Sequence, residues 1–328
     1  MEKYFITGST GLIGNALTRL LVAKDKPLHL LARSPSTLAP IKNQEVNIFQ
    51  GDITDYESVD KAMKGCSHVF HLAACATQFD KDPGVFDRVN VEGTRNVLQA
   101  ALNNQIEKVV YTSTAGLFPV TSISEDANED SEMPSQFMTD YIRTKFLAES
   151  VVNEFSEKGL SITKVYPTRV YGPGSLRESN SVTKILKFYS EGKWPFIPGN
   201  GKTYGNYVYL EDVVQGLLMA MESGKPGQGY ILGGENVTFD ELFRTIRIAS
   251  NKNHMLVHVP YPVLWFVSAI LQVIAGISGK PPLITPGWIR RYLEHRRLSS
   301  EKAIRELGYT ITPLNAGLTK TMEWLNQL

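Results

Sequence analysis

Apolar runs alternate with amphipathic segments through the first half of the chain, and this alternation limits the possible folds more than any other feature. The runs are nearly continuous, as expected of strands that are covered on both faces. The predicted strands are 3–8, 28–33, 46–51, 68–73, 108–113 and 161–167, and the predicted helices are 12–24, 55–64, 84–104 and 140–158. Strands that alternate with helices in this order form a doubly wound, parallel α/β sheet.

A glycine-rich turn joins the first predicted strand to the first predicted helix. The segment "TGSTGLIG" (7–14) places Gly8, Gly11 and Gly14 there. Glycines allow a tight turn and a close approach to a pyrophosphate, and the start of the helix offers N–H groups and a positive dipole end. The sequence therefore predicts a Rossmann fold with a dinucleotide site near the start of the chain.

The end of the second predicted strand indicates which dinucleotide is bound. It reads "LLARSPS" and places Arg33 at the strand end, where no carboxylate occurs. An acidic side chain at this point would hold the ribose hydroxyls of NAD, whereas an arginine suits the extra phosphate of NADP. We therefore expect NADP(H) as the cofactor, with NAD(H) as the alternative.

The pattern changes after residue 172. Turn residues dominate 171–175 and 194–206, whereas 229–234 resembles one more strand of the sheet. The divided pattern predicts a discontinuous second region. We expect a dinucleotide-binding domain at 1–172, to which 206–235 returns, and a smaller substrate-binding region formed by 173–205 and 236–328.

Composition excludes several classes of function. The 328 residues carry a formal net charge of +1, which gives no electrostatic reason to expect nucleic acid as a partner. Cys66 and Cys75 lack metal or redox spacing, and we interpret them as reduced residues of a cytoplasmic protein without a signal peptide. His254 and His258 have helical spacing but no carboxylate or cysteine cluster beside them, so we expect no metal site.

One strongly apolar stretch has two interpretations. Residues 261–279 are marginal in length for a membrane span and include Ser268 and Gln272. A buried or lid helix is one interpretation, and shallow contact with a membrane surface is the other. The basic run at 290–297 is interpreted as a solvated helix face.

Two tyrosine–lysine pairs have the spacing of one helical turn. Tyr141 and Lys145 form the first, and Tyr189 and Lys193 form the second. Residues four apart lie on the same face of a helix. A neighbouring ammonium favours the phenolate form of a tyrosine and so eases proton exchange with a substrate oxygen. Spacing alone does not decide which pair, if either, is catalytic.

Several motifs in a fixed order decide between the pairs. The glycine turn is followed by "GDITD" (51–55), "HLAA" (71–74) and "VNVEGTRNVL" (89–98). The later motifs are "VVYTSTAG" (109–116), "YIRTK" (141–145), "YPTRVYGP" (166–173), "YVYLEDVVQG" (207–216) and "RELGY" (305–309). Over essentially its whole length the chain resembles the extended short-chain dehydrogenases/reductases, and most closely the dihydroflavonol-4-reductase-like and 3β-hydroxysteroid-dehydrogenase-like branch.

This resemblance implies a role for each matching residue. Tyr141 would be the proton donor, Lys145 would support it and anchor the nicotinamide ribose, and Thr114 would bind the substrate oxygen. The catalytic residues implied are Thr114, Tyr141 and Lys145. The cofactor-binding residues implied are Gly8, Ser9, Thr10, Gly11, Leu12, Ile13, Gly14, Arg33, Asp52, Ile53, Leu72, Ala73, Ala74, Asn90, Thr112, Tyr141, Lys145, Pro167, Thr168 and Val170.

Three functions are compatible with this resemblance. The first is reduction of a ketone or aldehyde on a small apolar or aromatic substrate, by a monomer or homodimer. The second is a nucleotide-sugar epimerase or dehydratase. Members of that kind commonly carry an arginine for the diphosphate at the position of Gly205, although Arg177 or Arg244 could replace it. The third is a non-catalytic NADP sensor, which the retained tyrosine–lysine pair disfavours. We expect the first, with a pocket lined by the aromatic residues from Trp194 to Phe196 and by the apolar stretch that begins at Tyr261.

Overall fold

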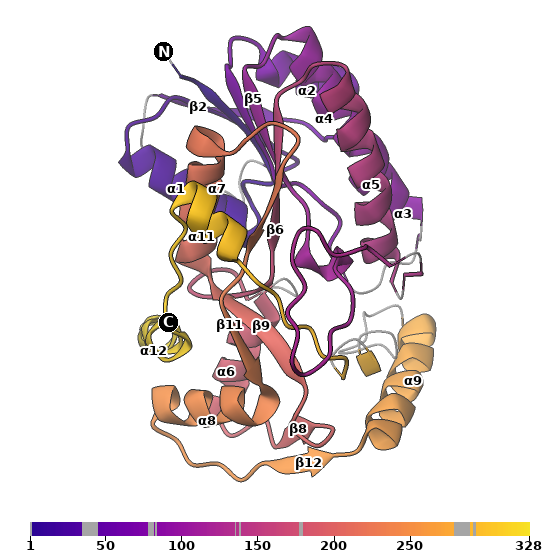
Figure 1. Ribbon diagram of the computed structural model, residues 1–328, viewed down its shortest axis with the longest axis vertical. Helices are drawn as coiled ribbons and strands as arrows, with labels where there is room; N and C mark the ends of the chain where they lie inside the picture. Colours follow the sequence, from indigo (N-terminus) through magenta and orange to yellow (C-terminus); the bar gives the residue numbers. More distant parts are fainter. Residues whose placement is uncertain are drawn as a thin grey trace.

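A seven-stranded parallel sheet forms the centre of the molecule in the computed structural model (Figure 1), which describes residues 2–34, 45–77, 82, 84–134, 136–137, 139–176, 180–278, 289–290 and 293–328. The strand order is β10-β6-β5-β4-β1-β2-β3. The strands are β1 (Tyr4–Thr7), β2 (Leu28–Ala32), β3 (Val46–Gln50), β4 (His68–His71), β5 (Lys108–Thr112), β6 (Ile162–Pro167) and β10 (Gly229–Leu232). The predicted doubly wound Rossmann sheet is confirmed.

The order of the strands reverses direction between β1 and β4. From β1 the chain runs outward through β2 and β3, and it then returns to continue on the other side with β4, β5 and β6. Thr7, the last residue of β1, pairs with Leu31 on one side and with His71 on the other. All the strands are parallel, so their carboxyl ends meet at one edge, where such folds bind their ligands.

Alternate side chains of the strands pack on opposite faces of the sheet. Ile6 of β1 contributes to a core under α1 (Leu12–Ala23), α7 (Leu210–Ser223) and α11 (Glu301–Leu307). Phe5 contributes to a second core under α2 (Tyr56–Met63), α4 (Gly93–Asn103) and α5 (Asp140–Glu157). Both residues are fully buried, which explains why the strands are nearly continuous apolar runs in the sequence.

The C-terminal part builds a smaller unit below the carboxyl edge of the sheet. A three-stranded sheet has the order β11-β9-β7, and a separate pair joins β12 to β8. The strands are β7 (Arg169–Tyr171), β8 (Phe196–Pro198), β9 (Tyr204–Tyr209), β11 (Glu235–Thr238) and β12 (Val257–Val259). A third apolar core joins this sheet to α6 (Ser181–Ser190), α8 (Phe239–Ser250) and α12 (Leu314–Leu325). Within 206–235, α7 and β10 pack with the central sheet, whereas β9 belongs to the smaller one.

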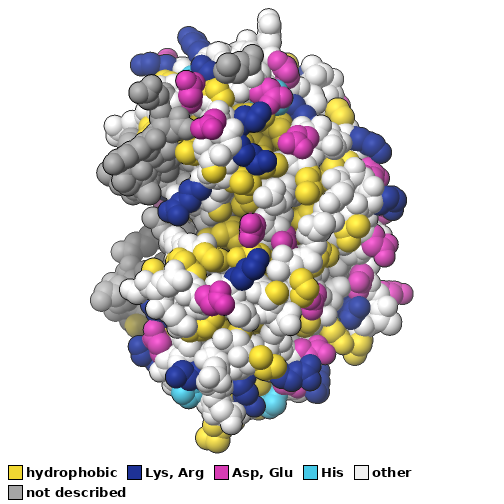
Figure 2. Space-filling view, turned by 90° about the vertical axis from the view of Figure 1, so that its left-hand side faces the viewer, with side chains coloured by type: hydrophobic (Ala, Val, Ile, Leu, Met, Phe, Trp, Pro, Cys, Tyr) yellow, Lys and Arg dark blue, Asp and Glu magenta, His cyan; other side chains and the backbone are white. Residues whose placement is uncertain are grey.

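The helix α9 (Tyr261–Ser278) lies at the periphery of the molecule (Figure 1). It is not a buried helix, because large apolar side chains such as Phe266 and Val273 are 62% and 64% exposed. The interpretation as a buried helix is therefore wrong, whereas the interpretation as a lid helix stays a prediction. In the part of the chain that the structure describes, no helix is both long and apolar enough to cross a membrane. On the face shown in Figure 2, basic and acidic side chains are interspersed and form no single basic patch.

Candidate active site

The glycine turn lies at the carboxyl end of β1, where the strand order reverses. Gly8 has a φ of +77°, which side-chain-bearing residues rarely adopt, and its carbonyl accepts a hydrogen bond from the Gly11 amide at 2.9 Å. A Cβ at Gly8 would lie 2.6 Å from the backbone nitrogen of Ala73, and one at Gly14 would collide with the Gly8 carbonyl. Gly11 caps α1 without a side-chain hydrogen bond, so the first amides of that helix point to the edge of the sheet.

Two buried hydroxyl groups make this edge suitable for a dinucleotide. Ser9 is fully buried, yet its Oγ has no hydrogen-bond partner among the described residues. The same holds for Oγ1 of Thr168, which follows β6. Buried polar atoms are normally satisfied, so unpaired hydroxyls here fit a polar ligand. The narrow glycine turn, the open helix end and these hydroxyls together fit a nicotinamide dinucleotide.

A chain of buried hydrogen bonds fixes the ends of β1 and β4 beside the turn. The Ala73 amide donates to Thr7 Oγ1 at 3.2 Å, and Thr7 Oγ1 lies 2.7 Å from Nδ1 of His71. His71 Nε2 lies 3.0 Å from Oγ1 of Thr94, whose own hydrogen goes to the Asn90 carbonyl at 2.7 Å. Thr94 must therefore accept from Nε2, which leaves Nδ1 to accept from Thr7. Burial, assisted by the charge of Lys145, lowers the pKa of His71 to about 3 and keeps it neutral.

Asn90 connects this chain to the helix that carries the first tyrosine–lysine pair. It lies in the π-helical turn η2 (Asp87–Glu92), between α3 (Gly84–Phe86) and α4. Its amide oxygen accepts from the Cys75 amide at 2.7 Å, and its Nδ2 donates to Oγ1 of Thr144 at 2.9 Å. The turn that carries Asn90 thus holds both the loop after β4 and helix α5.

Helix α5 places Tyr141 in its first turn and Lys145 one turn later. Thr139 caps the helix by accepting from the amide of Ile142 at 3.3 Å. Tyr141 is half-buried, whereas Lys145 is only 2% exposed. Lys145 Nζ donates to the carbonyl of Thr112 at 2.8 Å, at the carboxyl end of β5. Burial lowers the pKa of Lys145 to about 7, and the nearby Glu149 carboxylate acts in the opposite direction.

The hydroxyls that follow β5 differ in their hydrogen bonding. Thr114 caps the short 3-10 turn η3 (Ala115–Leu117), and its Oγ1 accepts from the Gly116 amide at 3.1 Å. That bond uses a lone pair and leaves the hydroxyl hydrogen available to a substrate oxygen. Ser113 is 5% exposed, and its Oγ has no partner within the described ranges. Ser113 is a second hydroxyl at this position that the sequence analysis did not select.

Most of the remaining predicted cofactor residues lie at the carboxyl ends of neighbouring strands. Arg33 directly follows β2 and is exposed. Asp52 follows β3, and its carboxylate accepts from the amide of Thr54 at 2.9 Å. Every other residue of the predicted set also follows or ends a strand at this edge or belongs to the glycine turn, apart from Asn90, the pair on α5 and Val170, which lies within β7 of the smaller sheet. The residues are Thr10, Leu12, Ile13, Ile53, Leu72, Ala74, Thr112 and Pro167.

The second tyrosine–lysine pair lies elsewhere and is structural. Tyr189 is fully buried in α6, and its hydroxyl accepts from the His254 amide at 3.1 Å. Lys193 lies beyond the end of α6 and pairs with Glu191 at 2.7 Å. Trp194 stacks on Phe196 with ring centroids 4.5 Å apart and packs on the third core. The prediction that these two aromatics line the substrate pocket is not supported by this packing.

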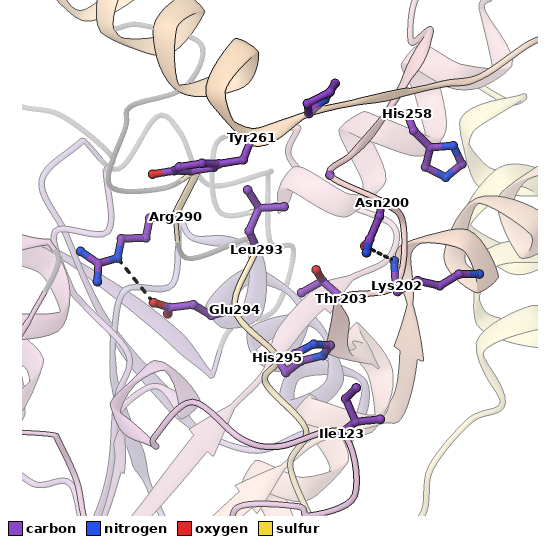
Figure 3. A pocket seen from close by; sticks show the side chains of 12 residues that line it. Ile123, Asn200, Lys202, Thr203, His258, Tyr261, Arg290, Leu293, Glu294 and His295 are labelled. Carbon is purple, nitrogen blue, oxygen red and sulfur yellow. Dashed lines mark hydrogen bonds and ion pairs between the residues drawn. The ribbon is translucent and has the colours of Figure 1, made fainter.

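A pocket of about 900 Å³ lies between the turn that follows β8, the start of α9 and the segment around Glu294 (Figure 3), and none of the predicted catalytic residues lines it. The loop that continues from Thr114 borders it through Ile123, and Tyr261 at the start of α9 borders it from the other side. The pocket contains two cations, each next to a carboxylate. Lys202 contacts Asp240 at 2.8 Å, and Arg290 lies 3.8 Å from Glu294. The charges in this part of the pocket therefore balance.

An arginine that the sequence analysis missed lies beside Gly205. A Cβ at Gly205 would collide with the guanidinium of Arg169, which also donates to the Tyr207 hydroxyl at 3.0 Å. Arg169 therefore occupies the space that a side chain at 205 would fill, and it supplies a cation there that differs from the two replacements considered in the sequence, Arg177 and Arg244. Only the parallel pairing of β7 with β9 reveals this, because Arg169 pairs with Tyr207 across a long stretch of sequence.

A second missed arginine, Arg296, belongs to the run interpreted as a solvated face. Its side chain is only 14% exposed, and its Nη1 donates to the carbonyl of Phe118 at 2.9 Å, just after η3. Burial lowers the pKa of Arg296, Glu294 raises it, and the charge of Arg169 adds to the lowering. Among the described residues, no group of histidines, cysteines and carboxylates is arranged to hold a metal ion.

The glycine turn, the carboxyl-edge hydroxyls and the pair on α5 follow one another as in a known family. The model of the NAD dependent epimerase/dehydratase family matches residues 4–233. The chain belongs to this family. Its members use a nicotinamide cofactor, in agreement with the fit of the glycine turn and the unpaired hydroxyls.

Relatives within and around this family are named for different substrates. A dihydroflavonol 4-reductase-like protein of Synechocystis sp. is 27% identical over 98% of this chain and 94% of its own length. A decarboxylating sterol-4-alpha-carboxylate 3-dehydrogenase of Bos taurus is 27% identical over 100% of this chain and 93% of its own length. The crystal structure of a UDP-glucose 4-epimerase from Thermotoga maritima, with UDP-glucose, has a TM-score of 0.81 at 22% identity and covers 99% of both chains. The last comparison shows the common fold.

Proposed function

We propose that this protein is an NADP(H)-dependent oxidoreductase that reduces a ketone or aldehyde on a small apolar or aromatic compound. The observation that carries the proposal is the setting of Tyr141 and Lys145 on α5. Lys145 is buried against the Thr112 carbonyl, and Tyr141, one turn earlier on α5, packs on the apolar cluster that contains Ala115, the residue after Thr114. A non-catalytic sensor would have no use for a buried lysine at this point, whose desolvation is unfavourable.

The side chains divide the proton chemistry among them. The Thr114 hydroxyl donates a hydrogen bond to the substrate oxygen and orients it. Tyr141 donates its phenolic proton to that oxygen as negative charge develops. Lys145, held in a low-dielectric site, favours the phenolate that remains. When bound, the nicotinamide would supply the hydride. The neutral His71 and Asn90 hold the end of β4 and helix α5 in position through their hydrogen bonds.

Arg33 supports a preference for NADP(H). It follows β2 at the point where the adenosine ribose lies in a Rossmann fold, and its exposed guanidinium could pair with the 2′-phosphate. The same proposal assigns 1–172 and 206–235 to cofactor binding, and it assigns 173–205 and 236–328 to substrate binding.

Two features support an apolar substrate. In the pocket of Figure 3 the two cations already have carboxylate neighbours, so a diphosphate would have to compete with Asp240 and Glu294. The matched relatives named for a dihydroflavonol and for a sterol act, by those names, on largely apolar ring compounds. A pocket of about 900 Å³ is large enough for ligands of this size.

One observation favours a second function, a nucleotide-sugar epimerase or dehydratase. The guanidinium of Arg169 lies where the family's phosphate-binding arginine would project from position 205. An arginine can pair with two phosphate oxygens at once, so this cation could serve a diphosphate. The fold similarity to the UDP-glucose 4-epimerase is compatible with both functions.

A substrate panel separates the two functions. The purified protein is mixed with NADPH and, separately, with dihydroflavonols, steroid ketones and aromatic aldehydes, and the absorbance of NADPH is followed. UDP-sugars are incubated with NAD⁺ or NADP⁺, because epimerisation begins with oxidation of the sugar. Net consumption of NADPH with a ketone or aldehyde is expected. An epimerised UDP-sugar, formed with the oxidised cofactor and without net build-up of the reduced cofactor, would overturn the reductase proposal and favour the epimerase.

A further inference from the structure

Helix α9 has one narrow stripe turned toward the protein. Ser268 is fully buried and Ala275 is 2% exposed, and Leu264 and Leu271 complete the stripe at intermediate exposure. These positions are spaced three or four apart, so they share one face of the helix. The rest of the described helix surface is turned away from the protein.

The outward surface of α9 is apolar. It includes Tyr261, Val263, Trp265, Phe266, Val267, Ile270, Val273 and Ile274, which are between 39% and 64% exposed, and Gln272 is an exposed polar residue among them. Residues 261–278 include no charged residue. A continuous apolar surface of this kind is rare on soluble monomers and marks a site for a protein or membrane partner.

The composition of this surface argues against a second copy of the chain as its partner. A stable protein–protein interface usually has a polar rim around its apolar centre. The exposed side chains described on α9 are apolar apart from Gln272, and none of them is charged. A lipid surface requires no such rim, because it adapts to the shape of the helix.

Aromatic and basic residues near the start of α9 match a bilayer surface. Tyr261, Trp265 and Phe266 are the kinds of side chain that gather at the boundary between headgroups and acyl chains. Tyr261 shares the pocket of Figure 3 with Arg290, whose side chain is 69% exposed. Between 279 and 297 the sequence has five basic residues, Lys280, Arg290, Arg291, Arg296 and Arg297, and the single acidic residue Glu294. Of these, Arg296 is buried and Arg297 pairs with Asp126 at 2.7 Å, so they do not contribute to a basic surface.

We propose that α9 docks this protein onto the surface of an anionic lipid bilayer. The helix lies in the plane of the interface, with its inner stripe on the protein and its outward side chains among the upper acyl chains. Arg290, whose side chain is 69% exposed beside the start of the helix, attracts the anionic headgroups. An orientation parallel to the membrane surface keeps the inner stripe packed on the protein. A helix that crossed the bilayer would have to separate from the protein along this stripe.

Vesicle binding by the full chain tests this proposal. The protein is sedimented with vesicles of phosphatidylcholine alone and with vesicles that also contain phosphatidylserine. We expect binding to both and stronger binding with phosphatidylserine. The double variant Phe266→Ser with Ile270→Ser should bind at least about tenfold more weakly, since two apolar side chains no longer enter the lipid. Failure of the unmodified protein to sediment with either vesicle overturns the proposal.

A matched control separates docking from a general loss of surface apolarity. Ile248 on α8 and Ile304 on α11 are 71% and 46% exposed, close to the 62% and 45% of Phe266 and Ile270. The double variant Ile248→Ser with Ile304→Ser should bind vesicles as the unmodified protein does. Equal weakening of the two double variants would contradict the role of α9.

Trp265 reports directly on the depth of the helix. Lipids brominated on their acyl chains should quench the tryptophan fluorescence of the unmodified protein, and Trp265→Phe should remove most of that quenching. Quenching that is unchanged in Trp265→Phe would overturn the proposal. A dimer that is seen by light scattering, and that the α9 double variant alone abolishes, would assign the surface to a second copy and overturn it as well.

Discussion

The chain contains the same tyrosine–lysine spacing twice, and the two pairs are buried in opposite ways. On α5 the lysine is inside: Lys145 is 2% exposed and contacts the Thr112 carbonyl, while Tyr141 is half-buried near a sheet edge. At the end of α6 the tyrosine is inside. Tyr189 is fully buried, and the side chain of Lys193 is 68% exposed and paired with Glu191.

The difference shows that spacing does not make a proton-transfer device. An exposed lysine is solvated and screened, so it has little effect on a phenol four residues away. A buried lysine acts through a low dielectric, and its effect is correspondingly larger. The second pair also lacks a polar edge beside it, since the Tyr189 hydroxyl is occupied by the backbone around His254.

The largest expected effect comes from removing the phenol of the first pair. Tyr141→Phe should lower turnover by about 10² or more, the usual scale for a lost general acid, while NADPH affinity changes little. The measurement is the rate of NADPH consumption with the best carbonyl substrate from the panel, together with a binding titration. Tyr189→Phe is the matched control and should keep its turnover. Equal losses in the two variants would remove the contrast between the pairs.

The second effect concerns pH and stability. The pKa of Lys145 is about 7 in the folded protein and about 10.5 in an unfolded chain. Between these values the unfolded state binds the extra proton, so the free energy of unfolding rises with pH, by at most about 1.4 kcal/mol per pH unit. Below about pH 7 Lys145 is protonated in both the folded and the unfolded state, and its contribution to the free energy of unfolding stays at its lowest value.

Urea unfolding from pH 6 to pH 9 measures this rise. Lys145→Met should lose it, so the variant gains most relative to the unmodified protein at pH 6 and least at pH 9. Lys193→Met should run parallel to the unmodified protein, because its ammonium is exposed in both states. If the free energy of unfolding of Lys145→Met followed the same pH dependence as that of the unmodified protein, Lys145 would not be desolvated, contrary to the structure.

The sequence predicted the sheet well because burial on both faces requires continuous apolar strands. The run 108–113, for example, contains β5 (Lys108–Thr112), and the run 229–234 contains β10. It also placed Tyr141 and Lys145 on one helix. The roles assigned to them and to Thr114 stay predictions, since they depend on a substrate and a cofactor.

Features that depend on tertiary pairing could not be predicted. Arg169 reaches the space beside Gly205 only because β7 lies next to β9, and Arg296 is buried only because its segment packs under η3. For α9, apolar composition indicated that the helix must be covered, but it did not show whether protein or lipid covers it. The local sequence pattern predicts which residues are buried. The packing of segments that are distant in the sequence determines which residues they contact.

A smaller effect is expected on the affinity for the cofactor. Only the first pair lies at the edge that carries Arg33, so NADPH should bind about tenfold more tightly than NADH, a difference of roughly 1.4 kcal/mol. Arg33→Asp should erase or reverse this preference, because a carboxylate repels the 2′-phosphate and can hold the ribose hydroxyls. Titration calorimetry of both proteins with both cofactors gives the affinities. Equal affinities in the unmodified protein would contradict the NADP preference.

The smallest expected effect is on stability, and it concerns the tyrosine of the second pair. Tyr189→Phe removes a buried hydroxyl that accepts from the His254 amide at 3.1 Å, and the ring that remains still fills the core. We expect the free energy of unfolding to fall by about 1 kcal/mol, the net worth of one buried hydrogen bond, with turnover unchanged at a temperature where the variant is folded. Tyr141→Phe should show the reverse, with turnover lost and stability nearly kept.

Denaturant unfolding and turnover, measured on the same preparations of both variants, test this prediction. If Tyr189→Phe were as stable as the unmodified protein but slower in turnover, then α6 would have to act on the active site, and the structural assignment of the second pair would be wrong.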